Sequence, residues 1–134
     1  MRAGIDLVHV PGVRASLERF GDRYLNRVYT RGEIADAGDD PVRRPERLAA
    51  RFAAKEAAIK AFGLADVGIA WTDLEVCRRA DGGCTLRLHG AARRAAGVRD
   101  TDAIALSLTH DGDYAAAVLV VDDRDASSSE RAPR

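Results

Sequence analysis

The spacing of apolar residues predicts a chain that alternates between strands and helices. Apolar and polar positions alternate over residues 4–10, which predicts a short strand. Apolar residues then recur mostly at steps of three and four over residues 13–28, which indicates a helix with a break near Gly21. Thr30 and Glu33 stand at the two positions of a capping box, so another short helix should begin there.

The longest predicted helix spans residues 45–62. Its residues are mostly Ala, Leu, Arg, Glu and Lys, all of which favour helices, and Gly63 follows as a C-terminal stop. Two alternating segments come next, at residues 73–78 and 85–89. The turn-forming residues 80–83 lie between them, so we expect a β-hairpin.

The last part of the chain predicts a short helix and a second strand pair. The helix covers residues 90–97, and the strands cover residues 104–110 and 114–121. Together the elements predict an α+β fold in which short antiparallel strand groups pack on one long central helix. We expect one domain over residues 1–122, followed by a flexible polar tail at residues 123–134.

Composition narrows the class of protein. A chain of 134 residues, 46% hydrophobic and 31% charged, is typical of a soluble single domain. The formal net charge is zero, which argues against binding to nucleic acid. No apolar run approaches the ~20 residues of a membrane span. Cys77 and Cys84 lack metal-binding spacing, and without a secretion signal we expect free thiols in a cytoplasmic protein.

Glu56 and Lys60 project from one edge of the buried face predicted for the long helix. With Phe52 at the centre of that face, Glu56 lies about 40° and Lys60 about 80° to one side, next to the small residues Ala49 and Ala53. An acid and a base at the edge of the core would suit a reactive site. The two residues are equally an i, i+4 pair of the kind that stabilises exposed helices, and spacing leaves both interpretations open.

Asp6 is a second carboxylate, placed within the apolar first strand. A strand carboxylate with apolar neighbours can simply point to solvent. If the fold brings Asp6 beside Glu56, the pair would offer hard oxygen ligands to Mg²⁺, which is usually held by one or two carboxylates together with substrate phosphates and water. His110 ends a strand at a turn, where a lone histidine is more often structural than catalytic.

Three segments together resemble the holo-acyl-carrier-protein synthase family of 4′-phosphopantetheinyl transferases. They are residues 4–8 (GIDLV), residues 51–63 (RFAAKEAAIKAFG) and residues 107–111 (SLTHD), the last followed by YAAA at 114–117. The second segment is specific in both residue types and spacing. The resemblance covers about residues 3–121, and the short length matches the small branch of that superfamily, which works as a trimer with sites between subunits.

The resemblance implies transfer of the phosphopantetheine arm of coenzyme A to a serine of an acyl carrier protein, with release of 3′,5′-ADP. The implied catalytic residues are Asp6 and Glu56, which would hold Mg²⁺ against the pyrophosphate, and Lys60, which would contact that phosphate and assist the leaving group. Either Glu56 or a metal-bound water would deprotonate the serine hydroxyl. The residues implied to line the coenzyme A site are Arg51, Lys60, Gly63, Ser107, Thr109 and His110.

The resemblance also implies that the carrier protein docks through its acidic helix. The first 31 residues hold six arginines against three acids, so a basic face can form there. Such a run is also compatible with an ordinary solvated helix side, and Tyr24 could pack either in the core or against the carrier. The residues expected to contact the carrier are Arg14, Arg19, Arg23, Tyr24, Arg27 and Arg31.

The chain departs from the family pattern at three places. His9 stands where the family usually has a glutamate, residues 64–66 (LAD) stand where it has Thr-Gly, and Ala105 stands where it often has a histidine. Asp66 would repel a nearby phosphate. These departures motivate a second hypothesis, a catalytically impaired relative that binds carrier proteins. A two-carboxylate enzyme acting on nucleic acid is a third, which the zero net charge disfavours.

Overall fold

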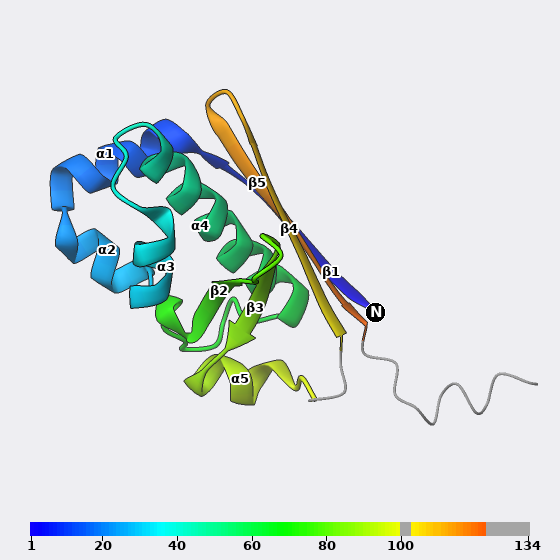
Figure 1. The fold of residues 1–134 in the computed structure, drawn as a ribbon. Coiled ribbons are helices and arrows are strands. Elements are labelled where there is room, and N and C mark those ends of the chain that lie inside the picture. Colours follow the sequence, from blue (N-terminus) through cyan, green and yellow to red (C-terminus); the bar gives the residue numbers. More distant parts are fainter. Residues whose placement is uncertain (100–102, 123–134) are drawn as a thin grey trace, which may run out of the picture.

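The computed structural model describes residues 1–99 and 103–122, so the tail predicted at 123–134 lies outside the described residues. The predicted α+β class is confirmed, because every predicted strand and helix is present (Figure 1). In chain order the elements are β1 (Arg2–His9), α1 (Val10–Phe20), α2 (Asp22–Val28), α3 (Arg31–Ala37), α4 (Arg43–Phe62), the 3₁₀ turn η1 (Trp71–Asp73), β2 (Leu74–Arg78), β3 (Cys84–Leu88), α5 (Gly90–Ala96), β4 (Ala103–Asp111) and β5 (Tyr114–Asp122).

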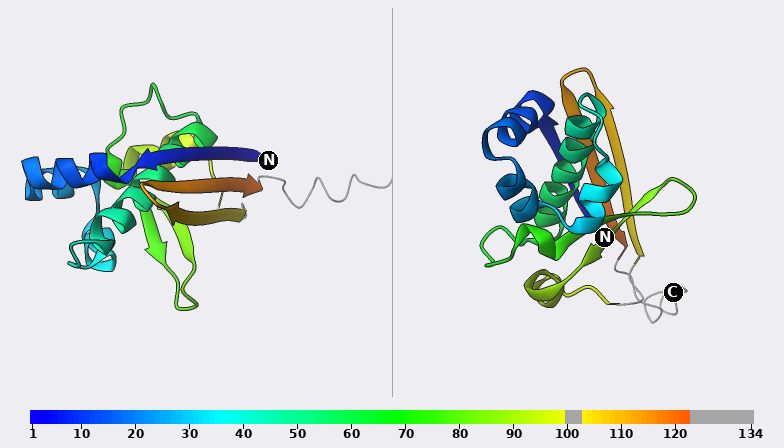
Figure 2. Two further views of the ribbon diagram at one scale, coloured as in Figure 1. Left: turned by 90° about the horizontal axis from the view of Figure 1, so that it is seen from above. Right: turned by 60° about the vertical axis from the view of Figure 1, so that its left-hand side comes forward.

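Three strands form an antiparallel sheet in the order β1-β5-β4, and β2 and β3 form a separate hairpin. The strands β1, β5 and β4 run side by side in Figure 2, and α4 crosses one face of their sheet (Figure 1). The other described helices lie on the same side of the sheet as α4. The core therefore lies between the sheet, α4 and the hairpin, and the outer face of the sheet is left without a covering helix among the described residues.

Local sequence signals set the helix ends. Gly21 has a φ of 54° and separates α1 from α2, as the break in the pattern predicted. The Thr30 side chain accepts a hydrogen bond from the Glu33 amide, and the Glu33 carboxylate accepts one from the Thr30 amide, which confirms the capping box. Gly63 adopts the left-handed conformation that ends α4.

The buried face of α4 is centred on alanines, so the prediction that Phe52 lies at its centre was wrong. Phe52 is half-buried and packs against the Trp71 ring at the edge of the core. The reason is that α4 is covered on several sides, by the sheet, by α1 and α3 and by β2, and small side chains allow all of them to approach. The alanines of α4 that are fully buried are Ala49, Ala53, Ala54, Ala57 and Ala58.

Gly4 is the point of closest approach between β1 and α4. A Cβ atom at this position would lie 1.9 Å from the carbonyl oxygen of Ala57, so only glycine lets the strand lie directly on the helix backbone. Side chains alternate along a strand, and Asp6 therefore points to the same side as Gly4, toward α4. The close packing at Gly4 thus fixes where the Asp6 carboxylate lies.

The two cysteines lie on opposite faces of the β2–β3 hairpin. Cys77 is opposite Thr85, and Cys84 is opposite Arg78, so the two side chains alternate between faces and remain free thiols, as expected. None of the helices in the described part of the chain is long and apolar enough to span a lipid bilayer.

We predict that Gly4→Ala lowers the free energy of unfolding by about 1–3 kcal/mol, because the added methyl group forces β1 away from α4. Urea denaturation followed by circular dichroism measures the change. Gly12→Ala in α1 is the matched control, since no atom lies within 4 Å of the added Cβ there, and it should leave stability equal or slightly higher. Equal stability of Gly4→Ala and the wild type would contradict the close-approach constraint.

Candidate active site

The structure brings Asp6, Glu56 and Lys60 together at the edge of the sheet formed by β1. Lys60 Nζ donates hydrogen bonds to Asp6 Oδ1 at 3.0 Å and to the Ile5 carbonyl oxygen at 2.9 Å. The interpretation of Glu56 and Lys60 as an ordinary pair along one helix is therefore too simple, because Lys60 reaches from α4 to β1. We call these three residues the carboxylate cluster.

Glu56 is the member of the cluster whose ionisation is perturbed. Partial burial raises the pKa of the Glu56 carboxyl above its ordinary value, the Asp6 carboxylate raises it further, and Lys60 opposes both effects. Two carboxylates that disfavour each other's charge are stabilised by a shared cation. Within residues 1–99 and 103–122, no group of three or more His, Cys, Asp and Glu side chains could hold a metal, so a cation here would need further ligands from substrate or water.

An apolar cavity of about 340 Å³ opens beside Glu56. It lies between the last turns of α4 and the segment that leads to β2, and Gly63, which ends the helix, is not among its lining residues. Glu56 is the one charged side chain among its lining residues. The others are Ile59, Leu64, Ala65, Val67, Ile69 and Trp71.

A second cavity, of about 370 Å³, contains three of the residues implied to bind coenzyme A: Arg51, Thr109 and His110. Arg47 and Arg78 join them, against the acids Asp36 and Glu46, and we call this space the arginine cavity. Three guanidinium groups suit a phosphate ligand.

Arg51 is the most buried charged residue of the arginine cavity. The residue is 6% exposed, and its Nη1 donates to the Arg47 carbonyl oxygen at 3.2 Å. Its Nε is buried and has no hydrogen-bond partner in the described structure.

The carboxylate cluster and the arginine cavity lie on different sides of one chain. Residues 51 and 56 are about 140° apart around a helix. Asp6 belongs to β1 and Thr109 to β4, the two outer strands on either side of β5. Ser107 lies apart from both groups, because it alternates with Leu108 and points to the outer face of the sheet. The implied site residues that the structure brings together thus form two separate groups rather than one pocket.

Two of the departures from the family pattern also lie on the outer face of the sheet. The His9 ring packs against Tyr114, with ring centroids 5.4 Å apart, and His9 is three positions from Asp6 along β1, so it faces the other way. The His9 ring therefore lies on the face of the sheet opposite to the Asp6 carboxylate. Ala105 shares the outer face with Ser107.

The basic residues of the first two helices flank an open hollow of about 330 Å³. Its lining combines Arg23, Arg27 and Tyr24 with Phe20 and Ser16. Tyr24 takes both roles left open by the sequence, because its ring lines the hollow while its hydroxyl bonds that of Tyr29 in the core at 2.8 Å.

Other expected members of this basic face lie outside the hollow. Arg14 and Arg19 are not among its lining residues, and the Arg19 guanidinium lies over the Phe20 ring, 5.2 Å from its centroid.

Sequence reasoning missed the charged pair formed by Lys55 and Glu33. Both are fully buried and form an ion pair of 2.7 Å. Glu33 was identified only as a helix cap. Lys55 could have been identified from its position, about 60° from Phe52 around α4 and inside the predicted apolar face. An ammonium group buried there without a partner would destabilise the fold, so a partner had to be expected.

We predict that Glu56→Gln raises the free energy of unfolding at neutral pH. A carboxyl group whose pKa is higher in the folded chain stabilises the fold at low pH, and this contribution is lost as pH rises through the folded pKa. The gain from the substitution should therefore be largest near pH 7 and vanish below about pH 4. Urea midpoints across this range measure it, with Glu18→Gln on the exposed side of α1 as the control. A gain that is independent of pH would contradict the electrostatic origin.

Comparison with known proteins assigns the chain to a family. A sequence model of the 4′-phosphopantetheinyl transferase superfamily matches residues 2–119. The chain is 43% identical over 121 residues to a holo-[acyl-carrier-protein] synthase of Koribacter versatilis, covering 90% of this chain and 96% of the relative. It is 46% identical over 108 residues to a synthase of the same name from Solibacter usitatus, covering 80% and 86%.

Solved structures show the same fold. An ACPS–CoA complex of Chronobacterium ammoniagenes is 34% identical with a TM-score of 0.74, and the match covers 90% of this chain and 95% of that one. A Helicobacter pylori holo-[acyl-carrier-protein] synthase in complex with coenzyme A is 26% identical with a TM-score of 0.75, covering 90% and 99%. With the carboxylate cluster at the motif positions and these matches over most of its length, the chain belongs to the 4′-phosphopantetheinyl transferase superfamily.

Proposed function

We propose that this chain transfers the 4′-phosphopantetheine group from coenzyme A to a serine of an apo acyl carrier protein and releases 3′,5′-ADP. The observation that carries the proposal is the carboxylate cluster, in which Asp6 and Lys60 meet beside Glu56 across the contact between β1 and α4. The relatives named holo-[acyl-carrier-protein] synthase support this reaction. Similar structures that contain coenzyme A support it as the donor.

Mg²⁺ fits the donor set of the carboxylate cluster. Asp6 and Glu56 offer hard oxygen ligands. The pKa of the Glu56 carboxyl is raised in the chain alone, and a bound cation would lower it. Mg²⁺ supplies positive charge against the pyrophosphate oxygens when it is bound.

The chain's own residues perform the remaining steps. Lys60, already within hydrogen-bond distance of Asp6, donates to a phosphate oxygen and stabilises the negative charge of the departing 3′,5′-ADP. Either Glu56 or a metal-bound water would accept the proton of the serine hydroxyl as its oxygen attacks the β-phosphate.

We infer that the complete site forms between copies of the chain. A pyrophosphate held by the carboxylate cluster needs cationic residues for the nucleotide, and those of the same chain lie across the sheet in the arginine cavity. The outer face of the sheet is apolar and exposed, with Ile5 66%, Leu7 64% and Val118 40% exposed. A homotrimer that buries this face would let the cavity of one copy approach the cluster of its neighbour.

The hollow on α1 and α2 is the proposed surface for the carrier protein. Arg23 and Arg27 provide positive charge around the apolar rings of Phe20 and Tyr24, a combination that suits an acidic helix with an apolar side. We place the reaction in the cytoplasm, which the two free cysteines support.

We predict that an apo acyl carrier protein gains about 340 Da, the mass of the phosphopantetheine arm, when incubated with the chain, coenzyme A and Mg²⁺. Glu56→Gln and Asp6→Asn should each abolish the gain, as should chelation of the metal, while Asp39→Asn in an exposed loop should preserve it. Intact-protein mass spectrometry measures the gain over a panel of carriers. Carrier binding without any mass gain would replace the proposal with the impaired-relative hypothesis.

We predict that two inactive variants restore activity when they are mixed. Asp6→Asn breaks the carboxylate cluster and Arg51→Ala breaks the arginine cavity, so each variant alone should be inactive. In a cyclic trimer assembled at random from equal amounts, about a quarter of the sites would combine an intact cluster with an intact cavity. Co-refolding followed by the transfer assay measures the recovery, with size-exclusion chromatography to verify assembly. No recovery from correctly assembled mixtures would mean that each chain completes its own site.

A further inference from the structure

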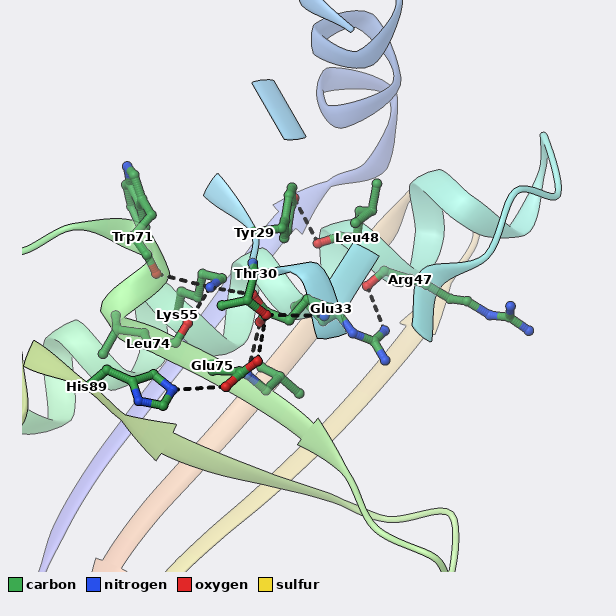
Figure 3. A network of polar contacts seen from close by, with 12 residues as sticks. Tyr29, Thr30, Glu33, Arg47, Leu48, Lys55, Trp71, Leu74, Glu75 and His89 are labelled. Carbon is green, nitrogen blue, oxygen red and sulfur yellow. Dashed lines mark hydrogen bonds and ion pairs between the residues drawn. The ribbon is translucent and has the colours of Figure 1, made fainter. Parts of the chain in front are cut away.

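The ion pair between Glu33 of α3 and Lys55 of α4 is the most buried charged contact in the described structure. Neither side chain is exposed, and Lys55 Nζ lies 2.7 Å from Glu33 Oε1 (Figure 3). Burial lowers the pKa of Lys55, and the Glu33 carboxylate opposes that shift. Apolar side chains of similar volume are often at least as stable as a buried ion pair, so stability alone is a weak explanation for this one.

All the hydrogen-bond donors of Lys55 are directed at a small group of acceptors. Besides Glu33, the ammonium group donates to the carbonyl oxygen of Trp71 at 3.0 Å and to that of Leu74. These two carbonyl groups bracket η1, so one side chain holds both ends of the turn against α4 (Figure 3). An ammonium group has three protons, and all three have an acceptor here.

Glu33 extends the same network into the hairpin. Its Oε2 accepts from the amide of Val76 in β2 at 2.9 Å, and its Oε1 accepts from the amide of Thr30 at 2.9 Å. The Thr30 hydroxyl in turn donates to Glu75, which contacts His89 at 2.9 Å near the surface (Figure 3). The ion pair therefore connects α3, α4, η1 and β2 at one point.

Trp71 links this network to the carboxylate cluster. Its ring packs on Phe52 with centroids 5.1 Å apart, and it lines the apolar cavity opposite the turn of α4 that carries Glu56. Lys55 and Glu56 are neighbours in sequence, so the residue that anchors the Trp71 backbone sits directly beside the candidate base. A shift of η1 would change the width of the cavity next to Glu56.

We propose that Glu33 and Lys55 are positioning residues, whose ion pair holds Trp71 at a fixed place opposite Glu56 and so sets the space in which the reacting groups meet. This inference rests on the proposed transfer reaction. It assigns to the pair an effect on the rate of the chemical step rather than on carrier binding, because none of the residues that line the proposed carrier surface bonds to Glu33 or Lys55.

The test compares Glu33→Gln/Lys55→Met with the wild-type chain. The double substitution removes both charges at similar volume and leaves one amide oxygen to accept a backbone N–H, so the chain should fold. Trp71 is the only tryptophan in the sequence, so its emission reports the position of η1 directly. We expect emission at longer wavelength, stronger quenching by acrylamide, a fall in kcat of about tenfold or more, and an unchanged KM for the carrier protein.

Two further variants separate positioning from stability. Glu33→Asp keeps the charge but shortens the side chain by one methylene, and it should shift Trp71 emission and lower kcat to a smaller extent. Val121→Ala truncates the core at the end of β5 and should lower stability while keeping wild-type emission and kcat.

Wild-type emission and kcat in the double variant would overturn the proposal. If the double variant does not fold, the same two readouts in Glu33→Asp decide. A wild-type chain that modifies no carrier would instead contradict the proposed reaction, and Trp71 emission in the variants would still decide whether the pair fixes η1.

Discussion

The close approach of β1 to α4 is the constraint on which the site depends. Gly4 of β1 contacts the backbone of α4 at Ala57. The alanines of α4 around Ala57 have side chains small enough for the strand to lie close to the helix. Two strand positions beyond Gly4, the same geometry places the Asp6 carboxylate within reach of Lys60 and close enough to Glu56 to raise its pKa. A larger side chain at the contact would separate residues that are 50 positions apart in sequence, so core packing and site chemistry are one property of this fold.

The burial of α4 on several sides determines what its charged residues can do. A charge that enters the core must find a partner, because desolvation without compensation is costly. Lys55 meets this condition with Glu33 and two carbonyl oxygens, and Arg51 meets it in part, with one nitrogen bonded to the Arg47 carbonyl oxygen. Glu56 and Lys60 lie where the helix emerges beside β1. On three different sides, α4 thus carries a member of a structural ion pair (Lys55), a candidate phosphate-binding residue (Arg51) and an acid–base pair (Glu56 and Lys60).

Local signals made the elements of the fold predictable, whereas the site was predictable only in part. Thr30, Gly21 and Gly63 act within a few residues of themselves, and each ended or began a helix where expected. The proximity of Asp6 to Glu56 depends on a contact between β1 and α4, which the spacing of residues along the chain does not reveal. It was therefore predicted from the family resemblance. The Glu33–Lys55 pair depends on the relative placement of α3 and α4, which neither periodicity nor the resemblance contained. Phe52 was predicted at the centre of the buried face of α4 because a helical-wheel projection gives most weight to large apolar residues. In the fold, several elements pack closely around α4, and that position is taken by small alanine side chains instead.

The order of the strands in the sheet explains why the implied site residues form two separate groups within one chain. Asp6 and Thr109 belong to outer strands separated by β5, and neighbouring strands lie about 4.8 Å apart, so a single chain separates its carboxylates from its arginine cavity by the width of the sheet. The same sheet leaves Ile5 and Leu7 exposed on its outer face, where water contact is unfavourable. Association through that face would remove apolar area from water and bring complementary halves together in one step. Assembly and activity would then depend on the same surface, which explains how a chain of this length could support a two-substrate reaction without enclosing either substrate alone.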